Sequence, residues 1–145
     1  MLVVEPIRMA DAGQVANLAL RSLRERYDPA WLEHQMGKGG PFLIARDIPT
    51  NAVVGFAVAD QKECEGHLLA LAVDRERRGE GIGSALLSNV RQELARAGAF
   101  KLRLEVRADD GAALAFYRRH GFYPDGLETH VYSDGGDAIR MQRSL

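Results

Sequence analysis

The sequence HLLALAVDRERRGEGIGSALLSNVRQELARAGAFKLRLEVR, residues 67–107, decides the fold. Its first seven residues, 67–73, are almost continuously apolar, which is typical of a strand that is buried on both faces. Apolar residues then recur every four positions, a spacing that predicts a helix over 81–97, and Gly98 follows as its end. The alternation over 101–107 predicts a second strand. A strand–helix–strand crossover of this kind predicts two parallel strands in one sheet.

Elements of both types extend the pattern on either side of this unit. Turn-forming residues between two apolar runs predict a hairpin, and Asp11 followed by Gln14 predicts a capping box at a helix start. The predicted elements are strands over 2–8, 42–46, 53–60 and 139–145 and helices over 11–26, 27–36 and 110–120. This order predicts a mixed α/β sheet with helices packed on it, in a single domain of residues 1–145.

The composition excludes several classes of function. The 145 residues carry 19 Lys and Arg against 20 Asp and Glu, and a net charge of −1 lacks the basic footprint of a general nucleic-acid binder. No apolar run approaches the ~18 residues of a membrane span, and the N-terminus shows no secretory signal. The single cysteine, Cys64, allows no internal disulfide and no multi-cysteine metal site. We therefore expect a cytoplasmic protein without nucleic-acid, membrane or metal partners, whose oligomeric state stays open.

A glycine-rich turn, residues 77–84, connects the first strand of the crossover to its helix. Three glycines within residues 79–83 let the backbone approach a ligand closely, and the helix start points unpaired N–H groups toward it. Arg77 and Arg78 add positive charge, so the turn is suited to a phosphate. There is no Gly-Lys-Ser/Thr ending, and Leu86 stands where G-x-G-x-x-G needs a glycine, so neither common nucleotide signature applies. By itself the turn is equally consistent with a tight connection.

Two spaced motifs carry a resemblance to a known family. They are Arg78-x-x-Gly81-x-Gly83 and, further along, Ala113-x-x-Phe116-Tyr117-x-x-x-Gly121-Phe122. The first resembles the pyrophosphate-binding loop of the GNAT acetyltransferase superfamily, which binds acetyl-coenzyme A (acetyl-CoA), and the second resembles the other signature of that superfamily. Both occur in the expected order, and the resemblance covers almost the whole chain. It implies a GNAT-type α/β (α+β) fold with a mixed, mostly antiparallel central sheet, a parallel strand–helix–strand crossover and flanking helices.

The second half of the chain is most similar to N-terminal protein acetyltransferases. Residues 102–122 and the tail YSDGGDAIRM, residues 132–141, resemble bacterial ribosomal-protein alanine acetyltransferases and their archaeal N-terminal acetyltransferase relatives. Three residues depart from that pattern: Asp110 replaces the usual Asn, Gly136 the usual Glu, and Val131 a second Tyr. The last two lie near the peptide groove that the resemblance implies, so they bear on the acceptor more than on the chemistry.

The same resemblance implies how acetyl-CoA is bound, with no metal. The backbone of the strand that ends at Val73 is expected to run beside the pantetheine arm like an added strand. The sheet is expected to splay after this strand, so that a free amide polarises the thioester carbonyl. Asp110 either contacts the cosubstrate or only caps its helix. The expected cosubstrate contacts are Leu71, Ala72, Val73, Arg78, Gly79, Gly81, Ile82, Gly83, Ser84, Asp110 and Tyr117.

Acetyl transfer needs a base for the amine, a donor to the oxyanion and a proton for the departing thiolate. Glu105 matches the family's catalytic glutamate and is the candidate base, acting through water; the alternative is a solvated charged face. His67 matches a histidine of the archaeal relatives and is either a second candidate base or structural. Tyr117 is the candidate acid, or otherwise a core aromatic residue. Tyr27 and Tyr132 are expected to line the acceptor groove.

The acceptor is expected to be the α-amino group of a protein N-terminus. An α-amine has an ordinary pKa of about 7.7–8.0 and a lysine amine about 10.4, so deprotonation at neutral pH costs about 1 and about 4–5 kcal/mol respectively. A weak base that acts through water is therefore enough to deprotonate an α-amine. One alternative is a small-molecule amine acetyltransferase, which a strongly acidic pocket would favour, and another is a non-catalytic acyl-CoA-binding module. Cys64 lies in no motif, so direct transfer is expected.

Overall fold

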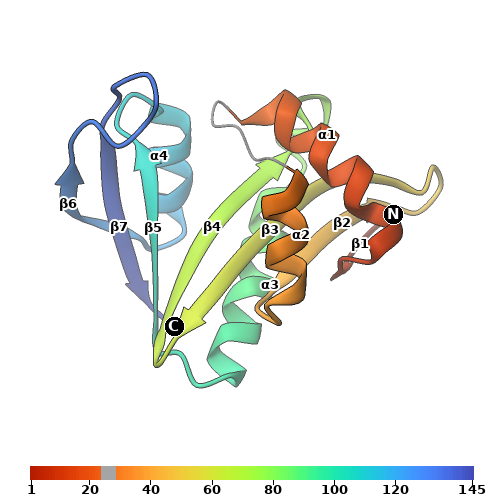
Figure 1. The fold of residues 1–145 in the computed structure, drawn as a ribbon, viewed down its shortest axis with the longest axis horizontal. Coiled ribbons are helices and arrows are strands. Elements are labelled where there is room, and N and C mark those ends of the chain that lie inside the picture. The colour runs from red at the N-terminus through yellow and green to blue at the C-terminus, as the bar shows by residue number, and fades with distance from the viewer. Residues whose placement is uncertain (24–28) are drawn as a thin grey trace.

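The computed structural model, which describes residues 1–23 and 29–145, contains a seven-stranded sheet with the strand order β1-β2-β3-β4-β5-β7-β6 (Figure 1). Neighbouring strands are antiparallel except β4 and β5, which run parallel. This confirms the predicted fold class, a mixed and mostly antiparallel sheet with one parallel crossover. The strands are β1 (Leu2–Pro6), β2 (Phe42–Asp47), β3 (Ala52–Lys62), β4 (Glu65–Val73), β5 (Lys101–Arg107), β6 (Tyr123–Glu128) and β7 (Ala138–Ser144).

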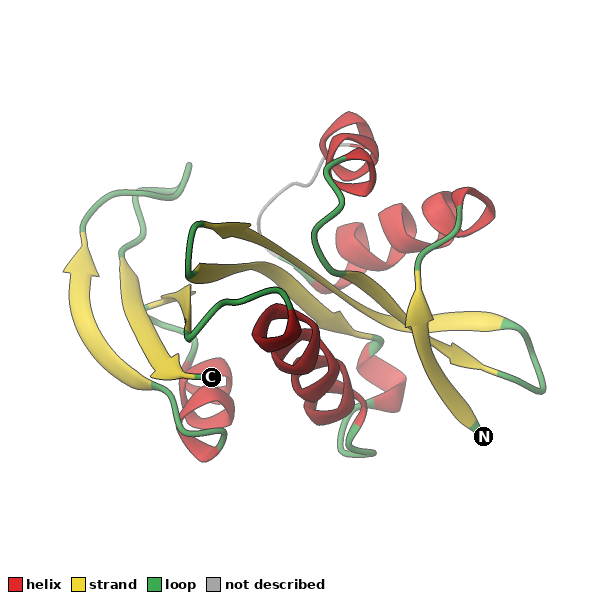
Figure 2. Cartoon of the chain, turned by 90° about the horizontal axis from the view of Figure 1, so that it is seen from below, coloured by secondary structure: helices red, strands yellow, loops and turns green. Residues whose placement is uncertain are grey.

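Helices cover both faces of this sheet (Figure 2). On one face, Leu18 of α1 and Leu32 of α2 pack against Phe56 of β3. On the other face, α3 buries Leu86 and Val90 against the first half of the sheet, and α4 packs beside it over β5 and β7. Strands β2 to β4 are thus covered on both sides, which explains their nearly continuous apolar sequence. The helices are α1 (Ala12–Ser22), α2 (Pro29–Gly37), α3 (Ile82–Arg96) and α4 (Gly111–Arg119).

Elements with strong periodicity lie where the sequence predicts them. β5 has the predicted bounds, and α3 is one residue shorter at each end than the predicted helix. α1 ends at Ser22, before the predicted end at residue 26, and residues 24–28 lie outside the described part. β6 was not predicted, because Pro124 and Gly126 disfavour a strand; a sheet edge tolerates them, and the register shifts between them.

The predicted capping box at Asp11 and Gln14 is wrong. Asp11 stands at the N-cap position of α1, but its side chain makes no capping bond; it accepts hydrogen bonds from the Arg8 backbone N–H at 3.0 Å and from Arg46 Nη2 at 2.7 Å. The Gln14 amide oxygen instead accepts a hydrogen bond from the backbone N–H of Val53 in β3 at 2.9 Å. Asp11 and Arg46 are 2% and 4% exposed, and Glu5 adds a second partner to Arg46 at 2.8 Å. A buried guanidinium needs such partners, and this need overrides the local capping pattern.

The pair also sets the charge state of Asp11. Burial raises the pKa of Asp11, but the hydrogen bonds from Arg46 and the Arg8 backbone, with the charges of both arginines, outweigh burial and hold that pKa below 3.8. Because the folded-state pKa is depressed, the stabilisation is present above the ordinary carboxyl pKa. It is lost as the pH falls through the lower folded-state pKa.

The feature that positions the site is the divergence of β4 from β5. Their ladder consists of Glu65↔Lys101, Gly66↔Leu102 and His67↔Arg103 and then ends. Immediately beyond, the β3–β4 register steps from Ala59↔Leu68 to Val58↔Ala70, so β4 carries one extra residue, as in a β-bulge. Leu68 and Ala70 accordingly pack into opposite cores. A bulge bends its strand, and β4 and β5 separate toward their C-terminal ends (Figure 1).

We expect Asp11→Ala to lower the free energy of unfolding at pH 7 by about 3 kcal/mol, because it removes the buried carboxylate that pairs with Arg46 and leaves this charge with Glu5 and the hydrogen bonds to Asn51. Urea denaturation measures this change. The double variant Asp11→Leu with Arg46→Met removes both charges and should recover most of the loss. A single-variant loss below about 1 kcal/mol would contradict the assigned role of the pair.

Candidate active site

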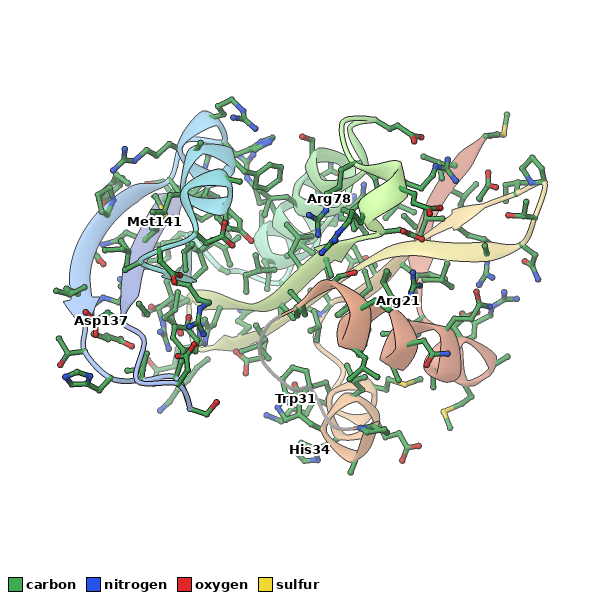
Figure 3. The ribbon with its side chains drawn as sticks, turned by 90° about the horizontal axis from the view of Figure 1, so that it is seen from above. Arg21, Trp31, His34, Arg78, Asp137 and Met141 are labelled. Atoms are coloured by element: carbon green, nitrogen blue, oxygen red, sulfur yellow. The ribbon has the colours of Figure 1, made fainter. Side chains whose placement is uncertain are left out.

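Two pockets meet in the opening between β4 and β5. We call the first the loop pocket: about 480 Å³, lined by the end of β4, the β4–α3 loop and α4. The second is the sheet pocket: about 550 Å³, lined by residues 67–71 of β4, residues 104–107 of β5 and the start of the β6–β7 loop. Leu71, Arg78 and Tyr117 line both pockets (Arg78 is labelled in Figure 3). Two molecules, one in each pocket, can therefore touch at this point.

A larger hollow, about 850 Å³, lies at the N-terminal end of β4. The loop before β2 and the β3–β4 turn line it, together with His67 and Arg103. Neither Glu105 nor the glycine-rich turn reaches it. Its size alone does not make it the reaction site, because Glu105, Tyr117 and the glycine-rich turn line the other two pockets and not this one.

The glycine-rich turn lines the loop pocket with exposed backbone. Gly79 and Gly81 each have φ +82°, a left-handed conformation that favours glycine, and a Cβ at either position would meet no atom within 4 Å. Their role is conformational, and they leave open space at the start of α3, where unpaired N–H groups bind anions. A Cβ at Gly83, in contrast, would approach the Phe116 ring to 3.3 Å, so this glycine lets α3 and α4 pack closely. The turn thus fits a diphosphate approached by main-chain nitrogens.

The polar side chains of the turn have different partners. Arg77 pairs with Glu80 at 3.0 Å, and Arg78 Nε donates to the Val73 carbonyl at 3.4 Å. The Ser84 hydroxyl is hydrogen-bonded to His120 Nε2 at 3.0 Å, which turns it toward α4. Burial, then the nearby arginine charges, lowers the pKa of His120, so this imidazole is neutral at pH 7.

In the sheet pocket, Glu105 and His67 form one unit. His67 Nε2 lies 2.8 Å from Glu105 Oε1 and 3.1 Å from Oε2, and Arg103 Nη1 lies 3.3 Å from Oε2. The sequence left the two as alternative bases; the structure joins them by a hydrogen bond across the point where β4 leaves β5. Both side chains are about three-quarters buried, with 21% and 25% exposed.

Burial raises the pKa of Glu105. The opposing effects are together larger: the hydrogen bond and charge of His67, then the charges of Arg103 and Arg140, bring that pKa below the ordinary 4.5. Glu105 is therefore an anion at neutral pH. It is a weak base by itself, suited to orienting a proton acceptor or a water beside His67.

The remaining predicted residues are distributed around these pockets. The Tyr117 ring packs edge-on against Phe116, with centroids 5.1 Å apart, and still forms part of both pocket walls. Asp110 caps α4 by accepting the Ala113 N–H at 3.1 Å and also lines both pockets. Tyr132 lines the sheet pocket. Tyr27 lies outside the described residues. Leu71, Ala72, Val73, Arg78, Gly79, Gly81, Ile82, Gly83 and Ser84 line the loop pocket.

Sequence reasoning missed Arg107 as a site residue. Its place in the β5 alternation assigned it to the charged face, yet it is only 8% exposed and lines the sheet pocket. Its ion pairs with Asp109 and Asp134 appear only in the structure, so the sequence carried no signal for this role. Within residues 1–23 and 29–145 there is no group of three or more His, Cys, Asp and Glu residues that could hold a metal ion. No helix in that part of the chain has the length and apolar character to cross a membrane.

Comparisons with known proteins agree on one family. Residues 13–122 match the Acetyltransferase (GNAT) family. A ribosomal protein bS18-alanine N-acetyltransferase of Escherichia coli is 37% identical over 107 residues, 72% of each chain. An N-alpha-acetyltransferase of Saccharolobus solfataricus is 30% identical over 152 residues, covering 95% of this chain and 90% of that protein.

Two further matches extend the likeness. An uncharacterized N-acetyltransferase of Methanocaldococcus jannaschii is 39% identical over 90 residues, and the match spans 61% of this chain but only 58% of that relative. The crystal structure of Ard1 from Thermoplasma volcanium superposes with a TM-score of 0.94 at 29% identity, covering 99% of this chain and 97% of that one.

We expect His67→Ala to raise the pKa of Glu105, because burial remains while the hydrogen bond and charge that oppose it are lost. A carbon-13 NMR titration of the Glu105 carboxyl measures the shift. His34→Ala, on the outer helix α2 (Figure 3), is the matched control and should leave the Glu105 pKa unchanged. An unchanged or lower Glu105 pKa in His67→Ala would show that the pair is not coupled.

Proposed function

Because the chain belongs to the GNAT acetyltransferase family, we propose that it transfers an acetyl group from acetyl-CoA directly to the α-amino group of a protein N-terminus. The observation that carries this proposal is the meeting of the loop and sheet pockets at Leu71 and Tyr117. One pocket is suited to a diphosphate, and the other holds an ionised Glu105 that is hydrogen-bonded to His67. A donor and an acceptor that enter from the two sides meet where a proton can be taken up.

Acetyl-CoA is proposed to occupy the loop pocket. Its diphosphate would lie at the start of α3, bound by main-chain nitrogens of residues 79–84 and by Arg78. Its pantetheine arm would lie along Leu71 to Val73, in the space that β5 leaves when it separates from β4, and would bond to strand backbone like an added strand. Asp110 lines the same pocket.

The proposed reaction is one displacement at the thioester carbonyl. The neutral amine nitrogen forms the new C–N bond, the C–S bond breaks, and the amine proton passes to the Glu105–His67 pair, directly or through a water. A backbone N–H of β4 at the splay stabilises the oxyanion, and the Tyr117 phenol donates its proton to the departing thiolate. Solvent then reprotonates Tyr117 and takes the amine proton from the Glu105–His67 pair. No acyl-enzyme intermediate is needed, and Cys64 is exposed, away from both pockets.

Three considerations support a protein N-terminus as the acceptor. An α-amine, with an ordinary pKa of about 7.7–8.0, needs only a weak base, and Glu105 is one. The sheet pocket combines acidic and basic side chains, among them Glu105, Glu128 and Arg107, whereas a polycationic amine would favour an acidic pocket. The relatives named above are described as an alanine N-acetyltransferase of a ribosomal protein and an N-alpha-acetyltransferase. Tyr132 then forms one wall of the acceptor groove.

An acceptor panel tests the proposed function. Coenzyme A release is measured with acetyl-CoA and either peptides that differ in their first residue or small amines such as spermidine and an aminoglycoside. We expect turnover with free-amine peptides and none with the same peptides blocked at the N-terminus. Turnover with small amines alone would replace the proposed acceptor, and binding of acetyl-CoA without any turnover would make the protein a binding module.

A matched glycine pair tests the cosubstrate site. Gly81 and Gly98 have φ +82° and +94°, at the start and just past the end of α3, and a Cβ at either meets open space. Alanine in the left-handed region costs about 1–2 kcal/mol, so both variants should lose similar stability. Gly81→Ala should also raise the KM for acetyl-CoA about tenfold, because relieving that strain moves the N–H groups of the turn. Equal KM values in the two variants would contradict the assignment.

A further inference from the structure

Arg107 joins the end of β5 to the loop between β6 and β7. It is 8% exposed, and its guanidinium carbon lies 4.4 Å from the centroid of the Tyr132 ring. Nη2 is ion-paired with Asp134 of the same loop, and Nε lies 3.6 Å from Asp109. The planar guanidinium thus stacks on an aromatic ring while pairing with a carboxylate, a combination that lysine does not reproduce.

The loop leaves a fitted space for this guanidinium. A Cβ at Gly136 would come within 2.7 Å of Arg107 Nη2, so a larger residue would displace one or the other. The loop also folds on itself: the Val131 N–H donates to the Gly136 carbonyl at 3.1 Å, and the Gly135 N–H to the Tyr132 carbonyl at 2.9 Å. The shape of the loop is local, and Arg107 holds it against β5.

This contact lies on the acceptor side of the site. Arg107 and Glu105 share one face of β5, and Arg107, Val131 and Tyr132 line the sheet pocket together with Glu105. None of residues 107 and 128–132 lines the loop pocket. A change at Arg107 therefore reaches the acceptor groove without touching the proposed diphosphate site.

We propose that Arg107 is a positioning residue for the acceptor: stacked on Tyr132 and paired with Asp134, it holds residues 129–137 as one wall of the groove beside Glu105. This inference rests on the proposed function, since it takes the sheet pocket to be the acceptor groove. Gly136 takes part in this contact, because only a residue without a side chain leaves room there for the Arg107 guanidinium.

The test compares Arg107→Lys, which keeps the charge but loses the planar stack, with Gly136→Ala, which crowds the guanidinium from the loop side. Both should raise the KM for an N-terminal peptide about tenfold and leave the KM for acetyl-CoA within about twofold. Arg96→Lys, on an exposed turn of α3, is the control and should change neither constant. An equal rise in both KM values, or no rise in either, overturns the inference.

Hydrogen exchange separates this inference from the proposed function. In Arg107→Lys, the amides of residues 129–137 should exchange faster than in the wild type, while those of residues 79–84 are unchanged. If the wild type acetylates no peptide, the proposed function fails and exchange alone decides the role of Arg107. Unchanged exchange over residues 129–137 then overturns the inference.

Discussion

The short parallel ladder between β4 and β5 is the constraint on which the rest of the structure depends. Three residue pairs hold the strands together, and the register step that follows turns β4 away from β5. A regular parallel pair would leave no room between the strands and would hide the backbone of β4. Because the ladder stops at His67↔Arg103, the backbone of residues 68–73 faces an opening that both pockets share.

The hydrogen bond between His67 and Glu105 spans the apex of this opening. His67 belongs to the last pair of the ladder, and Glu105 lies two residues beyond its partner on the diverging strand. The separation of the strands and the hydrogen bond between His67 and Glu105 therefore have one geometric origin. The hydrogen bond to His67 does most to lower the pKa of Glu105 against its burial, and the charges of Arg103 and Arg140 on the same face lower it too, so Glu105 is an anion. A buried charge is costly unless it is paired. Here the partner of Glu105 is His67, and the two lie beside the position proposed for the reacting amine.

The sequence predicts the crossover well, because β4 is an almost continuous apolar run, α3 and β5 each carry a strong period, and the glycine turn has a distinct spacing. It does not predict β6, whose Pro124 and Gly126 are tolerated only because β6 is an edge strand. It finds His67 and Glu105 separately, because only the register of β4 against β5 shows that residues 38 positions apart are hydrogen-bonded. Arg107 looks like one more surface charge until the β6–β7 loop is placed over it.

The central claim is that the opening between β4 and β5 holds acetyl-CoA along β4, with the diphosphate at the start of α3. Nitrogen-15 NMR of the full chain, titrated with acetyl-CoA, tests it directly. The account predicts that the amides of residues 71–73 and 79–84 shift together and become protected from exchange. Shifts confined to the large hollow at the other end of β4, around residues 38–41 and 60–63, or no shift at all, would contradict it.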